Sequence, residues 1–382
     1  MKVAMVGPYP LDSEVVPGGV AAVTQYLTRG LGRIDEIDLH VICCDSQVPQ
    51  DGEEERDGAT IHFRTCPRRL AQSTNWLFQR WLITKVLRYL KPDIVHGQGL
   101  ELPALVALHS GLPHVVTLHG VIWKETELDH PSWYRRLRGR FHARQALRQM
   151  LQLENVFIIS EYAARMLPAA GNYRQFVVNN PIGNEMFTIL NQPRSPHIIM
   201  VGGLRHRKDP LTGIRVMERV LETVPDATLH ILGLMSGTPL DDEVASYIMD
   251  RQLGERVKVL GLVPDKVLQE EYARASLLLI TSIEETAPIA IGEACAAGVP
   301  CVGTDAGGIP FMIHEGVNGF VRPIKDVTGL AERVVAILQD EELRGRLARG
   351  AKEIGQREFA LDSIAAKTVA AYRDIIAATA SS

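Results

Sequence analysis

The sequence predicts an α/β protein made of two Rossmann-like domains, each a doubly wound parallel sheet. Short runs of apolar and β-branched residues alternate with longer amphipathic stretches along most of the 382 residues. Strands joined by crossover helices form parallel sheets that are covered on both faces. The alternation stops in a turn-rich stretch at 183–195 and then begins again, which indicates a domain boundary there. A chain of this length can bury two separate cores.

The first domain, residues 1–190, is expected to begin with a strand. Helices are predicted at Val20–Leu31 and Trp76–Leu90, where apolar residues recur with helical spacing. The predicted strands are Val3–Val6, Leu39–Cys43, Asp93–His96, His114–Leu118 and Val156–Ser160.

The second domain, residues 191–358, repeats this pattern. Its predicted strands are His197–Val201, Thr228–Leu232, Val257–Leu260, Leu277–Ile280 and Pro300–Val302. Residues 359–382 contain a last helical pattern, Leu361–Ala378, which could pack beside either domain. In such folds ligands bind at the carboxyl ends of the strands, so a cleft between the two domains is the expected binding region.

Composition excludes several classes of protein. Lys and Arg number 41 against 45 Asp and Glu, a net charge of −4, so no global positive field is present to hold a nucleic acid. The five cysteines are odd in number and contain no CxxC pair, which argues against a disulfide framework or a thiolate zinc site and for reduced residues. The apolar run at the amino terminus is too short for a signal peptide, and a cytoplasmic location is expected.

Two glutamates in the stretch 282–302 carry the strongest chemical signal. Glu285 and Glu293 are separated by seven residues and follow a predicted strand. If a helix begins near Pro288, the two carboxylates lie about 10–12 Å apart along its axis, whereas a glycosidase pair lies about 5–9.5 Å apart. The larger separation suits the two ends of one extended ligand, with Glu293 on a ribose diol and free helix N–H groups near anionic oxygens. On spacing alone, two ordinary surface glutamates are an equal alternative.

The surrounding motifs resemble those of the GT-B glycosyltransferases, specifically the large retaining family 4. Glu285 and Glu293 match the carboxylate pattern of that family, Ala294–Pro300 its AxAxGxP segment with one register difference, and Gly307–Pro310 its GGxP element. Further motifs occur in the same order: Gly18-Gly19 after the first strand, Thr117–Gly120 (TxHG), Val201–Lys208 (VGxLxxxK) and Asn318-Gly319.

The resemblance implies a metal-independent transferase with no cofactor, which moves a sugar from a nucleotide-diphosphate sugar to an acceptor with retention of configuration. The implied catalytic residues are Glu285, which orients the sugar, and His119. The implied donor-binding residues are Gly18, Gly19, Arg205, Lys208, Ile289 and Glu293. A cationic pair, Arg205 and Lys208, would stabilise the negative charge that develops on the leaving diphosphate.

Two positions depart from the family pattern. Gly203 stands where members usually carry an arginine, so Arg205 is expected to replace that arginine unless its role is lost. Phe311 stands where a glutamate commonly follows GGxP, which puts one polar contact in doubt.

Simpler interpretations exist for several of these residues. Residues 205–208 could be a solvated basic turn capped by Asp209, and Gly18-Gly19 only a turn before a helix. His119 could be structural, and His96 is a weaker candidate for the same cleft. Asp241-Asp242 is interpreted as a helix start, so no metal site is expected.

Trp133–Arg148 carries six arginines and no carboxylate, which suggests peripheral contact with an anionic or lipid-linked acceptor at a membrane, although a solvated helix face is the commoner case. The stripe Trp76, Trp81 and Tyr89 is expected in the core. The rival functions are a nucleotide-sugar epimerase or hydrolase on the same fold, and a non-catalytic binding module.

Overall fold

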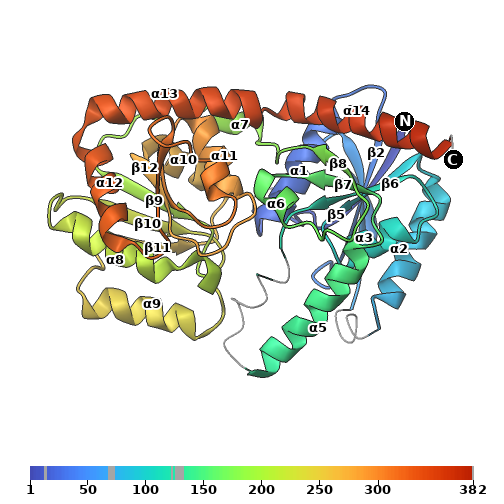
Figure 1. The fold of residues 1–382 in the computed structure, drawn as a ribbon, viewed down its shortest axis with the longest axis horizontal. Coiled ribbons are helices and arrows are strands. Elements are labelled where there is room, and N and C mark those ends of the chain that lie inside the picture. The colour runs from blue at the N-terminus through green and yellow to red at the C-terminus, as the bar shows by residue number, and fades with distance from the viewer. Residues whose placement is uncertain (13–14, 68–73, 122–123, 125–132, 381–382) are drawn as a thin grey trace. The chain divides into compact units, whose positions relative to one another are not determined.

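The computed structural model describes residues 1–12, 15–67, 74–121, 124 and 133–380, with the side chains of 133–138 left out (Figure 1). The chain divides into two compact units. Unit 1 comprises Met1–Leu11, Val20–Pro181 and Leu361–Ser382, and unit 2 comprises Asp12–Gly19 and Ile182–Ala360. The last helix therefore belongs to unit 1, and the main division falls after Pro181, several residues before the expected position at 190.

Unit 1 is built on an eight-stranded sheet in the order β3-β4-β2-β1-β5-β6-β7-β8, parallel except where β3 meets β4. The strands are β1 (Lys2–Val6), β2 (Asp38–Asp45), β3 (Gly52–Arg56), β4 (Ala59–Thr65), β5 (Ile94–Gln98), β6 (His114–Leu118), β7 (Asn155–Ile158) and β8 (Arg174–Val177). Its helices are α1 (Gly19–Leu31), α2 (Leu77–Leu90), α3 (Leu102–Leu108), α5 (Trp133–Met150), α6 (Glu161–Arg165) and α14 (Leu361–Ala380).

Alternate residues of the central strand β1 enter two different cores. Val3 and Met5 pack with α1 and α14 on one face, whereas Ala4 and Val6 pack with α2, α3 and α5 on the other. A parallel strand with both faces buried shows this pattern because successive side chains point to opposite faces. The helix α14 completes the first of these cores (Figure 1).

Unit 2 is built on a six-stranded parallel sheet in the order β11-β10-β9-β12-β13-β14. The strands are β9 (His197–Val201), β10 (Thr228–Leu232), β11 (Val257–Gly261), β12 (Leu277–Ile280), β13 (Cys301–Thr304) and β14 (Gly319–Arg322). The helices are α7 (Asn184–Phe187), η1 (His206–Lys208), α8 (Pro210–Leu221), α9 (Pro239–Asp250), α10 (Asp265–Arg274), α11 (Ile289–Ala297), η2 (Ile309–Phe311), α12 (Val327–Gln339) and α13 (Glu341–Glu358).

In each sheet the first strand of the unit lies in the middle, and the chain builds outward from it in both directions. The order reverses between β1 and β5 in unit 1 and between β9 and β12 in unit 2. Loops at such a reversal leave the sheet in opposite directions, which opens a crevice at the carboxyl ends of the two strands. These two places are where the fold favours ligand binding.

The two-sheet α/β fold is confirmed, and every strand predicted from the sequence is present to within two residues at either end. Four further strands, β3, β4, β8 and β14, were not predicted. The hairpin β3–β4 turns at Asp57-Gly58, where both residues have positive φ, the conformation of a two-residue hairpin turn. The charged run Gly52–Arg56 hid this edge strand because it has no apolar face.

The expectation of five reduced cysteines is wrong for two of them. Cys44 and Cys66 form a disulfide, with their Cα atoms 5.6 Å apart. Cys44 lies on β2 beside its neighbour β4, and Cys66 follows β4 directly, so parallel pairing of the two strands brings the sulfurs together. A spacing of 22 residues gave no sign of this pairing. Cys43, Cys295 and Cys301 are free and buried.

Reducing the Cys44–Cys66 bond should destabilise unit 1. In the chain-entropy account, opening a loop of 22 residues costs about 3 kcal/mol of stability. Thermal unfolding with and without a thiol reductant measures this, and Cys66→Ser should reproduce the reduced protein without added reductant. Equal melting temperatures for all three samples would contradict the prediction, as would a count of five free thiols in the unreduced protein.

Candidate active site

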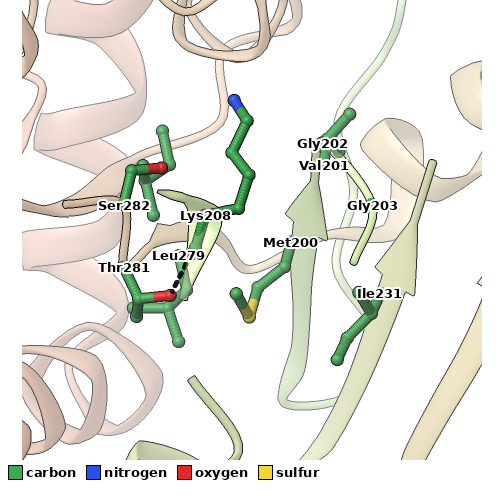
Figure 2. A pocket seen from close by; sticks show the side chains of 10 residues that line it. Met200, Val201, Gly202, Gly203, Lys208, Ile231, Leu279, Thr281 and Ser282 are labelled. Carbon is green, nitrogen blue, oxygen red and sulfur yellow. Dashed lines mark hydrogen bonds between the residues drawn. The ribbon is translucent and has the colours of Figure 1, made fainter. Parts of the chain in front are cut away.

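A pocket opens at the carboxyl ends of β9 and β12, at the point where the strand order of unit 2 reverses. Figure 2 shows the Thr281–Ser282 side of this pocket facing the Gly202–Gly203 turn, with the Lys208 side chain between them. The lining residues are Met200, Val201, Gly202, Gly203, Lys208, Ile231, Leu279, Ile280, Thr281 and Ser282. The floor of the pocket is therefore formed by apolar residues of the strands, and its polar groups come from the loops that follow β9 and β12.

The turn after β9 is made of two glycines for steric reasons. Gly203 has φ +74°, and a Cβ there would lie 2.1 Å from the carbonyl oxygen of Leu234. A Cβ on Gly202 would lie 2.9 Å from Cε of Lys208. The arginine that the family usually carries at position 203 thus has no room in this backbone, and a cation must come from another position.

The carboxylate of Glu285 is 5% exposed and lies between two cations. Oε1 accepts a hydrogen bond from Nζ of Lys208, and Oε2 lies 3.1 Å from a terminal guanidinium nitrogen (Nη1) of Arg207. The Ser282 hydroxyl also donates to Oε1, at 2.9 Å. Lys208 and Glu285, both predicted from the sequence, are thus brought together, but the arginine beside them is Arg207.

Three loops fix the position of Glu285. The amide of Gly308 donates to the carbonyl oxygen of Glu285 at 2.7 Å, and a Cβ on Gly308 would lie 1.9 Å from the carbonyl oxygen of Thr286. The amide of Ile283 donates to the carbonyl oxygen of Arg207 at 2.8 Å. The GGxP motif therefore lets the backbone at Gly308 pack closely against the loop that carries Glu285, and it is also a candidate for ligand binding.

The charge state of this cluster follows from burial and from its two cations. Burial by itself raises the pKa of Glu285, but the charges of Lys208 and Arg207 and the hydrogen bonds outweigh it and hold the pKa below its usual value. Burial, opposed by the charge of Glu285, lowers the pKa of Lys208. Arg207 remains protonated throughout, so Glu285 stays ionised and Lys208 is the first group of the three to change charge as the pH rises.

Glu293 lies on α11, whose N-cap is Pro288, as the sequence analysis expected for the start of that helix. It is 3% exposed, and one carboxylate oxygen accepts a hydrogen bond from the Tyr272 hydroxyl at 2.9 Å. This tyrosine is fully buried on α10 and also contacts the carbonyl oxygen of Ala290. Tyr272 was not among the predicted residues, because nothing in its spacing links it to the carboxylate pair.

The remaining predicted donor residues lie at the ends of three elements. Arg205 is exposed and precedes η1, while Ile289 is half-buried at the first position of α11. Gly18 has φ +145° and precedes α1, which begins at Gly19. In the described part of the chain, Arg205 forms neither a hydrogen bond nor an ion pair with Glu285, so its predicted role as the substitute arginine stays a prediction.

In unit 1, His119 follows β6 directly and meets Gln98 at the end of β5. Its Nε2 lies 2.7 Å from Oε1 of Gln98, and an amide oxygen only accepts, so Nε2 carries the proton. Burial lowers the pKa of His119 to about 4, so the ring is neutral at physiological pH. Gly7, at the end of β1, allows the approach, because a Cβ there would lie 2.5 Å from Cβ of Gln98.

The prediction that His96 is a weaker candidate for the cleft is wrong. It is fully buried in β5, with Nδ1 at 2.6 Å from the hydroxyl of Tyr372 on α14 and Nε2 at 2.6 Å from Oγ1 of Thr117. Burial, with a smaller contribution from His119, lowers the pKa of His96 to about 3. A neutral imidazole between two hydroxyls donates a hydrogen bond to one and accepts one from the other. His96 therefore connects α14 to the sheet through hydrogen bonds.

Two groups of potential metal ligands already have partners within the protein. Asp241 lies in the first turn of α9 and accepts from the backbone of Ser236 and Gly237, the helix-start role expected from the sequence. His197, His230 and Glu271 also gather their ligand atoms within 4.8 Å of one another. Both carboxylate oxygens of Glu271 are already bound, by the two imidazoles and by Arg274.

Two family models match the chain in succession. The model described as "Glycosyltransferase Family 4" matches residues 17–183, and the model described as "Glycosyl transferases group 1" matches residues 183–354. Together they cover both units, and the chain belongs to this glycosyltransferase family. One relative is the N-acetyl-alpha-D-glucosaminyl L-malate synthase of Bacillus anthracis, 28% identical over 179 residues. That match spans 47% of this chain and 45% of the relative.

Several solved structures have the same fold. Sucrose-phosphate synthase from Thermosynechococcus elongatus superposes with a TM-score of 0.77 at 17% identity, covering 99% of each chain. Anabaena HepE in complex with UDP-glucose superposes with a TM-score of 0.72 at 18% identity, covering 97% of this chain and 100% of that one. At these identities the likeness confirms the GT-B fold and no more.

Gln98→Glu should raise the pKa of His119 from about 4, because a carboxylate at 2.7 Å from Nε2 stabilises the imidazolium. The pH titration of the His119 ring signal by NMR measures this, with His119→Asn identifying the signal. Gln98→Met removes the acceptor without adding charge and serves as the control. An unchanged pKa in the glutamate variant would contradict the contact between the two side chains.

Proposed function

We propose that this protein is a retaining glycosyltransferase that moves a sugar from a nucleotide-diphosphate sugar to an acceptor. The observation that carries the proposal is the cluster of Glu285, Lys208 and Arg207 beside a pocket at the strand-order reversal of unit 2. This cluster has one carboxylate and two cations, and therefore an excess positive charge next to the pocket. An anionic diphosphate is the ligand chemistry that such an excess favours.

Arg207 and several of the predicted residues have roles in the proposed reaction. When the sugar–phosphate bond breaks, its electron pair stays on the diphosphate, and Lys208 with Arg207 stabilises the charge that develops there. Glu285, held by the same cations, orients the sugar, and Glu293 binds the ribose. The family resemblance further implies roles for Gly19 and for His119, whose neutral ring has an unprotonated Nδ1 that can accept a hydrogen bond. Retention of configuration and independence of metal ions are implied by the family resemblance, and the two cations support the latter.

The nucleotide and the sugar are open to a direct test. HepE, a structural neighbour, was solved with UDP-glucose, which makes UDP the first nucleotide to try. A thermal-shift panel of UDP, GDP and ADP with their sugars identifies the donor, because a ligand that binds the native state raises the melting temperature. Incubating the donor alone separates a transferase from an epimerase or hydrolase, which would convert it without an acceptor. Binding without turnover across an acceptor panel would favour a non-catalytic module.

The predicted cytoplasmic location and the acceptor contact through Trp133–Arg148 stay predictions. In the described residues, no helix combines the length and the hydropathy that crossing a bilayer requires. The side chains at 133–138 lie outside the described residues.

Glu285→Gln should lower the turnover number at least about a hundredfold while leaving nucleotide binding in place, because the amide keeps the shape but loses the charge that orients the sugar. Steady-state transfer assays and the thermal shift with the nucleotide measure the two effects. The glutamine variant is preferable to Glu285→Ala, since it keeps the side-chain volume and an acceptor oxygen and so leaves no cavity. Both variants remove the charge that pairs with Lys208 and Arg207, so the melting temperature of each is measured beside that of the wild type. Glu284→Gln changes the neighbouring carboxylate and should retain turnover; retained turnover in Glu285→Gln would refute the assignment.

Nucleotide affinity should fall as the pH rises, beginning below 10.5, the ordinary pKa of a lysine. Burial lowers the pKa of Lys208, and only its protonated form attracts a diphosphate. Losing one charge-assisted hydrogen bond weakens binding about tenfold to a hundredfold. Calorimetric titration with the nucleotide between neutral and alkaline pH tests this. Lys208→Arg keeps its charge over the same range, so its affinity should stay level; a parallel fall in both proteins would contradict the role of Lys208.

A further inference from the structure

The helix α2 turns a row of large apolar side chains toward solvent. The sequence analysis placed Trp81 and Tyr89 in the core, and the structure contradicts this for both. The outer face of α2 exposes Leu77 (62%), Phe78 (50%), Trp81 (52%) and Tyr89 (82%). The opposite side of the helix supplies the buried contacts with the sheet, through Ile83, Val86, Leu87 and Leu90. We define the α2 outer face as Leu77, Phe78, Trp81, Lys85, Arg88 and Tyr89.

These residues form one continuous face because of helical spacing. At 100° per residue, positions 77, 78, 81, 85, 88 and 89 fall within about a third of a turn. The rings of Phe78 and Trp81 are 5.9 Å apart, and Nζ of Lys85 lies 3.6 Å from the centre of the Trp81 ring. Other exposed apolar side chains, such as Met249 on α9, occur without such neighbours in their own helix.

The charged side chains of α2 are all basic. They are Arg80, Lys85 and Arg88, and Lys91 follows the last turn. Within the described part of the chain, no ion pair is found for any of these four residues. A protein surface that binds no partner seldom gathers four large apolar side chains beside unpaired cations.

The helix α5 lies against the same core as α2, on the same face of the sheet. Its described outer residues add Arg140, Arg144 and Arg148, all exposed, and Phe141, which is 53% exposed. Figure 1 shows both helices on the side of unit 1 away from α14. A second helix on the same face of the sheet therefore also presents exposed arginines.

We propose that the α2 outer face binds the surface of a membrane that contains anionic lipids. Leu77, Phe78 and Trp81 would enter the region between headgroups and acyl chains, where an indole ring is favoured. Lys85 and Arg88 have long apolar stems and would keep their charges at the level of the phosphates. A bilayer suits this face because it offers negative charge above an apolar layer and needs no groove on the protein. The proposal does not depend on the proposed transferase activity.

Vesicle flotation with the full-length protein tests this binding. The probes are vesicles of phosphatidylcholine alone and vesicles with about 30% phosphatidylglycerol, since each basic residue near an anionic surface adds to the attraction. The protein is expected to float with the anionic vesicles and at least about tenfold less with the neutral ones. Failure to float with either would overturn the proposal and leave a protein as the partner of this face.

Three variants locate the contact. Phe78→Ser with Trp81→Ser should lower the bound fraction about tenfold, because both rings leave the interface. The double variant Lys85→Glu, Arg88→Glu should abolish the preference for anionic vesicles. Met249→Ser removes an equally exposed apolar side chain from unit 2 and should bind like the wild type.

Two results would overturn the assignment to α2. One is unchanged flotation of the Phe78→Ser, Trp81→Ser protein. The other is a loss of flotation in Phe141→Ser alone, which would place the contact on α5. Because these serines replace exposed side chains, the variants should keep the wild-type melting temperature and its nucleotide-induced shift, which shows that any loss of flotation is not a loss of folding.

Discussion

The candidate site depends on neutralising one buried carboxylate. Glu285 is nearly inaccessible, and an isolated carboxylate in such a place would take up a proton or unfold its surroundings. Lys208 and Arg207 keep it ionised, and both reach it from the turn that follows β9. The net positive charge that the site presents to a ligand is thus the part of the two cations' charge that Glu285 does not neutralise. Replacing any member of the cluster leaves the charges of the others unbalanced, and an isosteric substitution at least keeps the packing around them.

Close approach of backbones is the second requirement of this site. Gly203 and Gly308 each lie where a Cβ would overlap a carbonyl oxygen of a neighbouring loop. These contacts hold the β9 turn and the carboxylate loop close to their neighbours. An arginine at position 203 would not fit this backbone, since φ there is +74°.

Unit 1 presents a site of opposite character. His119 is neutral, is bound by an uncharged amide, and lies near a second neutral imidazole that connects the sheet to α14 through Tyr372. Such a ring exchanges hydrogen bonds with hydroxyl groups without carrying charge, which suits contact with a sugar. The buried polar chain also explains how the last helix of the sequence comes to complete the first unit.

The sequence by itself determined the elements and the class of protein. Alternation of apolar runs located the central strands, because buried parallel strands are mostly apolar, and ordered motifs from Gly18 to Gly319 identified the family. It did not reveal the edge strands β3 and β8, whose residues are largely exposed. Tertiary structure alone decided the rest. Arg207 rather than Arg205 reaches Glu285, Gln98 meets His119, Cys44 meets Cys66, and Trp81 faces solvent, because each of these depends on which strands are neighbours and which side of a helix is covered, and local spacing carries neither.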